Sequence, residues 1–233
     1  MTNTNQKDLR RGGFYWLDGQ PLLSTTEILK VFDKPALRYW YGQEVYFAMV
    51  KDPSLNQQEA LAAPYQAGKT AAARGTTVHS IVEAFKQTGA VLEGIPEEFQ
   101  GYATAFYNFM KEVNPEIIEQ EKTIFDLENK VAGTLDMYGK IGEKFYILDI
   151  KTGKDIYAES ELQLSAYAHM LRLEGKPVDA IGVCLLETGE DKLPTGKYKF
   201  AQRTEHHEVF LHAKAMYEWQ NREKLLKAGY LTK

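Results

Sequence analysis

The sequence predicts an α/β fold in which a small mixed β-sheet is flanked by helices. Three strand-like runs follow one another at residues 117–126, 130–140 and 143–151, and a fourth covers 178–187. A helix-like segment over 159–174 separates the third run from the fourth, which is an order typical of α/β proteins. The part before residue 116 is predicted to be mostly helical, because its apolar residues recur at helical spacing.

Length and composition favour a single domain over residues 1–233, long enough to bury a core. We expect three parts: a mostly helical part over 1–115, a sheet with one helix over 116–204, and a C-terminal helix within 205–233. A hydrophobic share of 44% and a charged share of 26% are ordinary for a soluble protein. No apolar run approaches the ~18 residues of a membrane span, so we expect a cytoplasmic protein that contacts no membrane.

The single cysteine and the net charge narrow the classes of site. One cysteine, Cys184, excludes a disulfide framework and a four-cysteine zinc or iron–sulfur site. It lies in an apolar run and is expected to be a small buried residue. The formal net charge of −4 means that any contact with nucleic acid must use a local basic patch.

The helical part begins with a short hairpin over residues 14–20 and a capping box at Ser24-Thr25-Thr26-Glu27. Prolines are expected to break helices at 52–54 and at 62–64. Long helices should then cover 69–87, carrying His79, and 97–113. Aromatic side chains crowd residues 35–50, and we expect most in the core and one or two stacking on exposed bases: Tyr39, Trp40, Tyr41, Tyr46 and Phe47.

Charged residues inside the third strand-like run point to chemistry. Asp149 and Lys151 lie two apart in an otherwise apolar strand, so their side chains should share one face. Burying such charges is costly unless a cation or a phosphate meets them. Asp136 lies 13 residues before Asp149, and a tight turn over 140–143 should bring the two carboxylates together. Neighbouring carboxylates favour a shared hard cation, and Mg²⁺ fits this donor set.

Two further groups would complete such a site. The carbonyl of Ile150, between Asp149 and Lys151, is an additional oxygen ligand for the cation. The Lys151 ammonium is placed to orient an attacking water or to offset charge on a phosphorane-like transition state. Glu121, on the preceding strand, is a candidate for the metal shell, although Glu119 shares its face and the pattern does not separate them.

Several motifs follow one another in a recognisable order along the chain. They are the segments 24–29 with 37–40, the segment 74–83 around His79, Gly133-Thr134-Leu135-Asp136, Asp149-Ile150-Lys151, and Gln163 with Tyr167. Together they resemble the PD-(D/E)XK nuclease superfamily, whose core is restriction-endonuclease-like, and in particular its RecB-like exonuclease branch. The resemblance covers about residues 24–190 and includes similarity to phage-encoded members and to the mitochondrial genome maintenance exonuclease. Leu135 stands where the proline of the superfamily name would be, as in many members.

The resemblance implies a role for each site residue. It makes Asp136, Asp149 and Lys151 the catalytic set. It places His79 on the metal beside Asp136 and Asp149, with Mg²⁺ as the expected ion and Mn²⁺ as its substitute. Some relatives carry a four-cysteine iron–sulfur cluster, which the single cysteine of this chain excludes. The resemblance assigns Gln163 and Tyr167 to the DNA backbone or to support of Lys151.

Two basic residues are candidates for phosphate binding from their predicted position alone. Lys69 and Arg74 lie near the expected start of the long helix, where backbone N–H groups favour phosphate.

The predicted function is therefore metal-dependent hydrolysis of DNA phosphodiester bonds, most simply by an exonuclease acting on single-stranded or free-ended DNA in replication, recombination or repair. A structure-specific or restriction-type endonuclease of the same superfamily is one alternative. A non-catalytic DNA-binding module that assists recombination is another. DNA is the expected partner, with a replication or recombination protein as a second partner class, in a bacterial or phage-infected cell. No oligomeric state is predicted.

Overall fold

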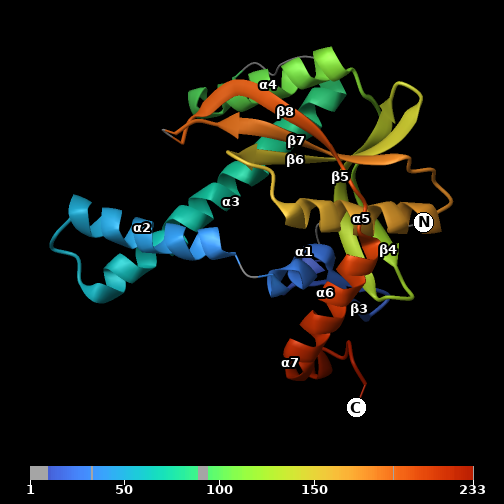
Figure 1. Ribbon diagram of the computed structural model, residues 1–233, viewed down its shortest axis with the longest axis horizontal. Helices are drawn as coiled ribbons and strands as arrows, with labels where there is room; N and C mark the ends of the chain where they lie inside the picture. Colours follow the sequence, from blue (N-terminus) through green and yellow to red (C-terminus); the bar gives the residue numbers. More distant parts are fainter. Residues whose placement is uncertain (1–9, 33, 89–93, 191, 233) are drawn as a thin grey trace.

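A computed structural model describes residues 10–32, 34–88, 94–190 and 192–232 (Figure 1). Its strands are β1 (Arg10–Arg11), β2 (Phe14–Leu17), β3 (Gln20–Ser24), β4 (Glu116–Asp126), β5 (Val131–Ile141), β6 (Lys144–Gly153), β7 (Ala180–Thr188) and β8 (Pro194–Arg203). Its helices are α1 (Thr25–Ile28), the 3-10 turn η2 (Leu29–Val31), α2 (Pro35–Lys51), α3 (Gln57–Thr88), α4 (Glu97–Val113), α5 (Ala158–Leu173), α6 (His207–Gln220) and α7 (Arg222–Lys227).

The strands form one mixed sheet, which confirms the predicted fold class. Their order is β1-β2-β3-β5-β6-β7-β8, and β4 pairs with β5 outside this path. Pairing is antiparallel between β4 and β5, between β5 and β6 and between β7 and β8, whereas β3 with β5 and β6 with β7 are parallel. Parallel neighbours need a crossover connection, and α5 supplies the one between β6 and β7.

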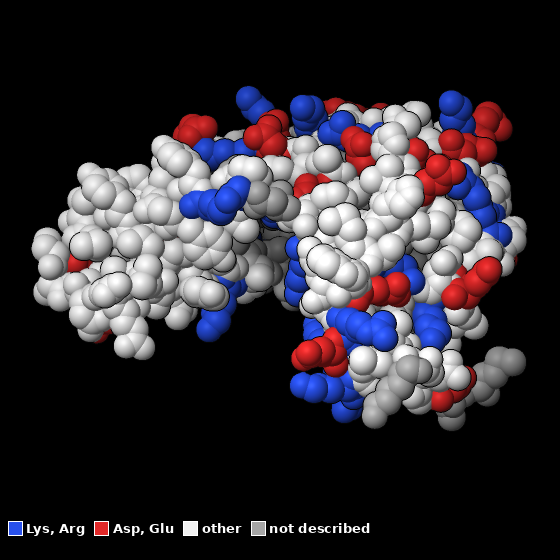
Figure 2. All heavy atoms as spheres, turned by 60° about the horizontal axis from the view of Figure 1, so that its bottom comes forward, with Lys and Arg blue, Asp and Glu red and all other residues white. Residues whose placement is uncertain are grey.

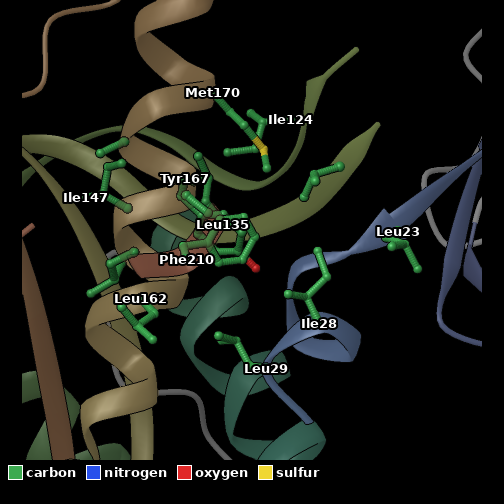
Figure 3. Close-up of a cluster of buried hydrophobic side chains, with 14 of the residues drawn as sticks. Leu23, Ile28, Leu29, Ile124, Leu135, Ile147, Leu162, Tyr167, Met170 and Phe210 are labelled. Carbon is green, nitrogen blue, oxygen red and sulfur yellow. The ribbon is translucent and has the colours of Figure 1, made fainter. Parts of the chain in front are cut away.

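Helices cover both faces of this sheet (Figure 1). On one face, α5 and α6 bury a core that includes Leu135, Ile147, Tyr167 and Phe210, and Figure 3 shows these side chains converging. On the other face, α3 and α4 bury a second core around Val78, Phe106, Phe109 and Leu148. Neighbouring residues of β6 alternate between the two cores, as Ile147 and Leu148 do, because successive strand residues point to opposite faces.

A two-helix arm projects from the body of the molecule. It consists of α2 and the first half of α3, which lie side by side (Figure 1). The expectation that its aromatic residues are mostly core is wrong: Tyr39, Tyr46 and Phe47 are 72%, 64% and 56% exposed. The reason is that α3 is the main packing partner of α2, and one partner helix can cover only one side of it. Figure 2 shows that much of the arm's surface on the side in view is uncharged.

The helix ends differ from prediction at one proline. The break after Lys51 is confirmed, since α2 ends there and Asp52 is its C-cap. The break at Pro64 is wrong, because α3 begins at Gln57 and continues through that residue. A proline within a helix costs about 3 kcal/mol, which the alanine-rich sequence around it and the packing of α2 along α3 help to offset. Within the described residues, no helix is both long and apolar enough to cross a membrane.

The capping box is only half formed. Ser24 caps α1, because its Oγ accepts the backbone N–H of Glu27 at 3.2 Å. The carboxylate of Glu27 does not return to Ser24; it accepts hydrogen bonds from Lys30, Lys224 and the Tyr217 hydroxyl. Glu27 thus joins the α1 segment to the C-terminal helices.

Candidate active site

The candidate site lies inside the sheet, at a fork where β5 separates from its neighbours β3 and β6. β4 pairs along one side of β5. On the other side, β3 pairs with Val131 and Ala132 at the start of β5, and β6 pairs with the residues from Met137 to Ile141. Among the described residues, positions 133–136 pair with neither strand on that side. Instead, the Ile150 N–H donates to Asp136 Oδ2 at 2.7 Å. A side chain therefore replaces the ladder where β5 and β6 separate.

Three potential ligands meet at this fork. His79 Nδ1, from α3, lies 3.5 Å from Glu121 Oε1 of β4 and 3.7 Å from Asp136 Oδ1 of β5. One ligand atom from each residue falls within 4.8 Å of the others. Glu119, the alternative to Glu121, points elsewhere and accepts hydrogen bonds from Lys122 and Lys176. The structure thus distinguishes two glutamates that the sequence pattern left equivalent.

The backbone of Glu121 explains how its side chain reaches the cluster. Its neighbours Gln120 and Lys122 pair with Met137 and Leu135, which leaves Glu121 opposite Asp136 without a ladder partner. Its φ is +50°, in the left-handed region that side-chain-bearing residues rarely adopt. Such a conformation costs roughly 1–3 kcal/mol and is common at functional sites. This backbone conformation accompanies the placement of the Glu121 carboxylate near that of Asp136.

Asp149 and Lys151 form a pair beside this cluster, as their spacing predicted. Lys151 Nζ lies 2.7 Å from Asp149 Oδ1, and Asp149 is 1% exposed. The other oxygen, Oδ2, is buried and has no hydrogen-bond partner among the described residues. An unsatisfied buried carboxylate oxygen is costly, so this atom favours a bound cation. Asp149 is not part of the three-ligand cluster itself but joins it through Ile150, whose N–H Asp136 accepts.

The Ile150 carbonyl points into the fork. In a β-strand, the N–H and C=O of one residue are directed to the same neighbouring strand. Because the Ile150 N–H is directed to Asp136, its carbonyl oxygen also faces the side where β5 has separated. This orientation is compatible with the predicted ligand role.

The electrostatics of the site reflect burial and mutual attraction. A hydrogen bond to Glu121 and the charge of Asp136 raise the pKa of His79 to about 9. Burial raises the pKa of Asp136 above its ordinary value and that of Asp149 to about 6. Burial opposes the charge of Lys151, but attraction to Asp149 and Asp136 outweighs it and raises the pKa of the ammonium. Three carboxylates, those of Glu121, Asp136 and Asp149, meet only two basic side chains here, His79 and Lys151, and this excess of acidic groups suits a cation.

Gln163 and Tyr167 support Asp149 from α5. Gln163 Nε2 lies 3.4 Å from Asp149 Oδ1 and 3.2 Å from the Tyr167 hydroxyl. Tyr167 is only 3% exposed, and its ring lies against Gly133, where a Cβ atom would stand 2.2 Å from Tyr167 Cε1. A DNA contact by Tyr167 does not fit this burial. Tyr167 packs on Gly133 instead, so the Gln163–Tyr167 motif contacts the motif that contains Asp136.

Lys69 and Arg74 do not lie at a helix start. Both are in the interior of α3, twelve and more residues after Gln57, where the backbone N–H groups are used within the helix. The expectation that Lys69 and Arg74 bind phosphate beside the free N–H groups of a helix start is therefore wrong. Arg74 is nevertheless one turn from Val78 and His79, and its buried Nε has no hydrogen-bond partner among the described residues.

Comparison with known proteins gives only distant structural similarity. No family model and no curated protein matches the chain. The alkaline exonuclease LHK-Exo from Laribacter hongkongensis is similar at TM-score 0.39 and 13% identity, with 90% of each chain covered. SSO0001 is similar at TM-score 0.39 and 11% identity, covering 90% of this chain and 87% of its own. LHK-Exo in complex with dAMP is similar at TM-score 0.31 and 14% identity, over 87% of this chain and 93% of that one.

Proposed function

We propose that this protein is a metal-dependent nuclease that hydrolyses phosphodiester bonds of DNA. The observation that carries the proposal is the three-ligand cluster of His79, Glu121 and Asp136 beside the buried Asp149–Lys151 pair. A ligand cluster alone would suit a structural metal. The ammonium next to it supplies positive charge where a phosphate oxygen would become more negative. The match to the PD-(D/E)XK pattern supports the same conclusion.

The residues present fit a divalent cation with oxygen preference. Carboxylates of Asp136 and Glu121, the imidazole of His79 and the Ile150 carbonyl are its proposed ligands, and the unpartnered Asp149 Oδ2 supplies a further one. Three of the four side chains are carboxylates, so Mg²⁺ is the proposed ion and Mn²⁺ its substitute. When bound, such an ion lowers the pKa of water and polarises a phosphoryl oxygen.

The chain's own groups would divide the remaining work. Lys151 is held by Asp149 and is about one-third exposed, and its proposed role is to orient the attacking water and to offset the oxyanion. Gln163 fixes Asp149, and Tyr167 fixes Gln163. Both are positioning residues, since neither is placed to meet the reacting atoms. We further propose that the enzyme is an exonuclease that acts on free-ended DNA and that residues 1–233 act as one nuclease unit.

Digestion of end-labelled linear and circular single-stranded DNA, with and without Mg²⁺, tests the proposal. Linear DNA should be degraded only with metal, and circular DNA should survive; cleavage of the circle would indicate the endonuclease alternative. Lys151→Ala should lower the rate by about 10²–10³-fold, the cost of losing one oxyanion-stabilising group. It should still bind DNA.

Lys144→Ala is the matched control, because Lys144 is an exposed lysine at the opposite end of the same strand. Its cleavage rate should equal that of the unaltered protein. Thermal unfolding of both variants checks that the fold is kept. Near-normal turnover by a folded Lys151→Ala protein would refute the mechanism.

A further inference from the structure

A groove lies where the arm leaves the body. Its floor and walls come from η2 and the first two turns of α2, and it encloses about 530 Å³. In Figure 2, Lys and Arg side chains border the notch between the arm and the body. The groove combines three cationic side chains with apolar and aromatic ones: Lys30, Lys34, Arg38, Phe32, Leu37 and Tyr41.

The cations of the groove are suited to phosphate. Lys34 is the N-cap of α2 and Arg38 lies in its first turn, where the Arg38 N–H donates to the Lys34 carbonyl at 3.2 Å, so the two residues are one turn apart. Lys30 is held by the buried Glu27, whereas Lys34 Nζ lies 3.2 Å from Glu159 Oε1 and the Lys34 side chain is 50% exposed. A solvent-exposed lysine contributes only about 0–1 kcal/mol through such an ion pair, so Lys34 can exchange Glu159 for a phosphate. Among the described residues, the side chain of the α2 N-cap, Lys34, makes no capping hydrogen bond.

The aromatic residue of the groove has a fixed orientation. Tyr41 is 37% exposed, and its ring packs edge-on against Trp40 at 5.2 Å and Tyr65 at 6.2 Å between ring centroids. Two neighbours that hold the ring leave part of it available to a flat partner. Cationic side chains beside an aromatic ring are the combination that binds single-stranded nucleic acid, in which the bases are free to stack.

The groove is connected to the candidate site through α5. Lys34 contacts Glu159, in the first turn of this helix. Gln163, which contacts Asp149, is four residues further along, so it lies one helical turn from Glu159. A strand lying in the groove would therefore end close to the Asp149–Lys151 pair.

We propose that this groove is a binding subsite for unpaired polynucleotide, with phosphates on Lys34 and Arg38 and a base on Tyr41. The proposal rests on the proposed function for what occupies the neighbouring site, but binding in the groove needs no metal and no catalysis. Duplex DNA should bind there less well, because its bases are already stacked on one another and offer Tyr41 no face.

Binding is measured with the full chain carrying Asp136→Asn, in EDTA, by fluorescence anisotropy of a labelled single-stranded oligodeoxynucleotide over a range of salt. Lys34→Ala and Arg38→Ala should each reduce the slope of log K against log salt by about 0.7, the value for one phosphate contact on a single strand. Tyr41→Ala should weaken binding by about fivefold or more, and Tyr41→Phe should restore it. Lys51→Ala is the matched control: an exposed lysine in the last turn of α2, expected to change the slope little.

Unchanged slopes and affinity in the Lys34, Arg38 and Tyr41 variants would overturn the proposal. So would an equal effect of Lys51→Ala, or a hairpin duplex that binds as tightly as the single strand. Turnover of bis-p-nitrophenyl phosphate with Mn²⁺ tests the nuclease proposal independently of the groove, because so small a diester does not need the groove to bind. The groove variants should retain that turnover; its absence in the unaltered protein would refute the nuclease and leave the binding result to decide the groove.

Discussion

Replacing Gly133 by alanine should disrupt the support of Asp149 from a distance. An added Cβ would stand 2.2 Å from Cε1 and 2.9 Å from Cζ of Tyr167, distances that real Cβ atoms essentially never show. The tyrosine ring cannot simply move aside, since Tyr167 is 3% exposed and packed in the core (Figure 3). Either β5 or the ring must shift. Gln163 would then be pulled away from Asp149, because it is bonded to both.

The magnitude follows from overpacking. An extra methyl in a filled core costs about 1–3 kcal/mol. For a chain of this length, each kcal/mol lowers the Tm by roughly 2–4 °C, so Gly133→Ala should unfold roughly 2–12 °C below the unaltered protein. Urea unfolding and thermal unfolding should agree on the loss.

Two controls make this prediction specific. Gly68, inside α3, has open space around its Cβ position, so Gly68→Ala should stabilise the protein by about 0.5–1 kcal/mol through helix propensity. In a Tyr167→Leu background, the cost of Gly133→Ala should shrink, because the clashing ring is gone. A Gly133→Ala protein as stable as the parent, or a cost unchanged by Tyr167→Leu, would refute the reasoning.

Two further perturbations test the same structure. Burial opposes the charge of Glu27, but hydrogen bonds from Lys30, Lys224 and Tyr217 lower its pKa from 4.5 to about 2. The folded pKa is below the unfolded one, so this stabilisation is complete above about pH 4.5 and is lost as the pH falls toward about 2; the Tm advantage over Glu27→Gln should shrink in that window, and parallel pH profiles would contradict it. The Glu121→Gly protein should be more stable than the Glu121→Ala protein by about 1 kcal/mol in unfolding free energy, because a left-handed φ is unfavourable for alanine and not for glycine. Thermal unfolding of the two variants measures the difference. An ordinary strand position would favour alanine instead.

The sequence was informative wherever periodicity alone decides the geometry. The two-residue period of a strand is enough to put Asp149 and Lys151 together, and they are 2.7 Å apart. The same period cannot separate Glu119 from Glu121. What separates them is a register shift in β4 between Ile117 and Glu119 and a left-handed residue further on, neither of which the residue types encode. The fork could not be predicted from the sequence for the same reason, since it depends on where β3 and β6 stop pairing with β5.

The aromatic residues of the arm show a different kind of failure. Helical spacing of apolar residues predicts a buried face only when another element is present to cover it. In the arm, α2 is covered by α3 on one side only, so Tyr39, Tyr46 and Phe47 remain exposed. Whether an element covers that face depends on contacts between residues far apart in the sequence, which a local pattern does not predict.

The motifs around the site are better understood as one packing unit than as separate signatures. Gly133 gives room to the Tyr167 ring, Tyr167 bonds to Gln163, and Gln163 bonds to Asp149. On the other side, Asp136 accepts the N–H of Ile150 and so holds β6 at the point where its ladder with β5 has ended. The fork stays open because a carboxylate, rather than a backbone carbonyl, satisfies that N–H. The chemistry and the fold therefore depend on the same few contacts, and a substitution at Gly133, which is no proposed ligand, should displace Asp149, which is one.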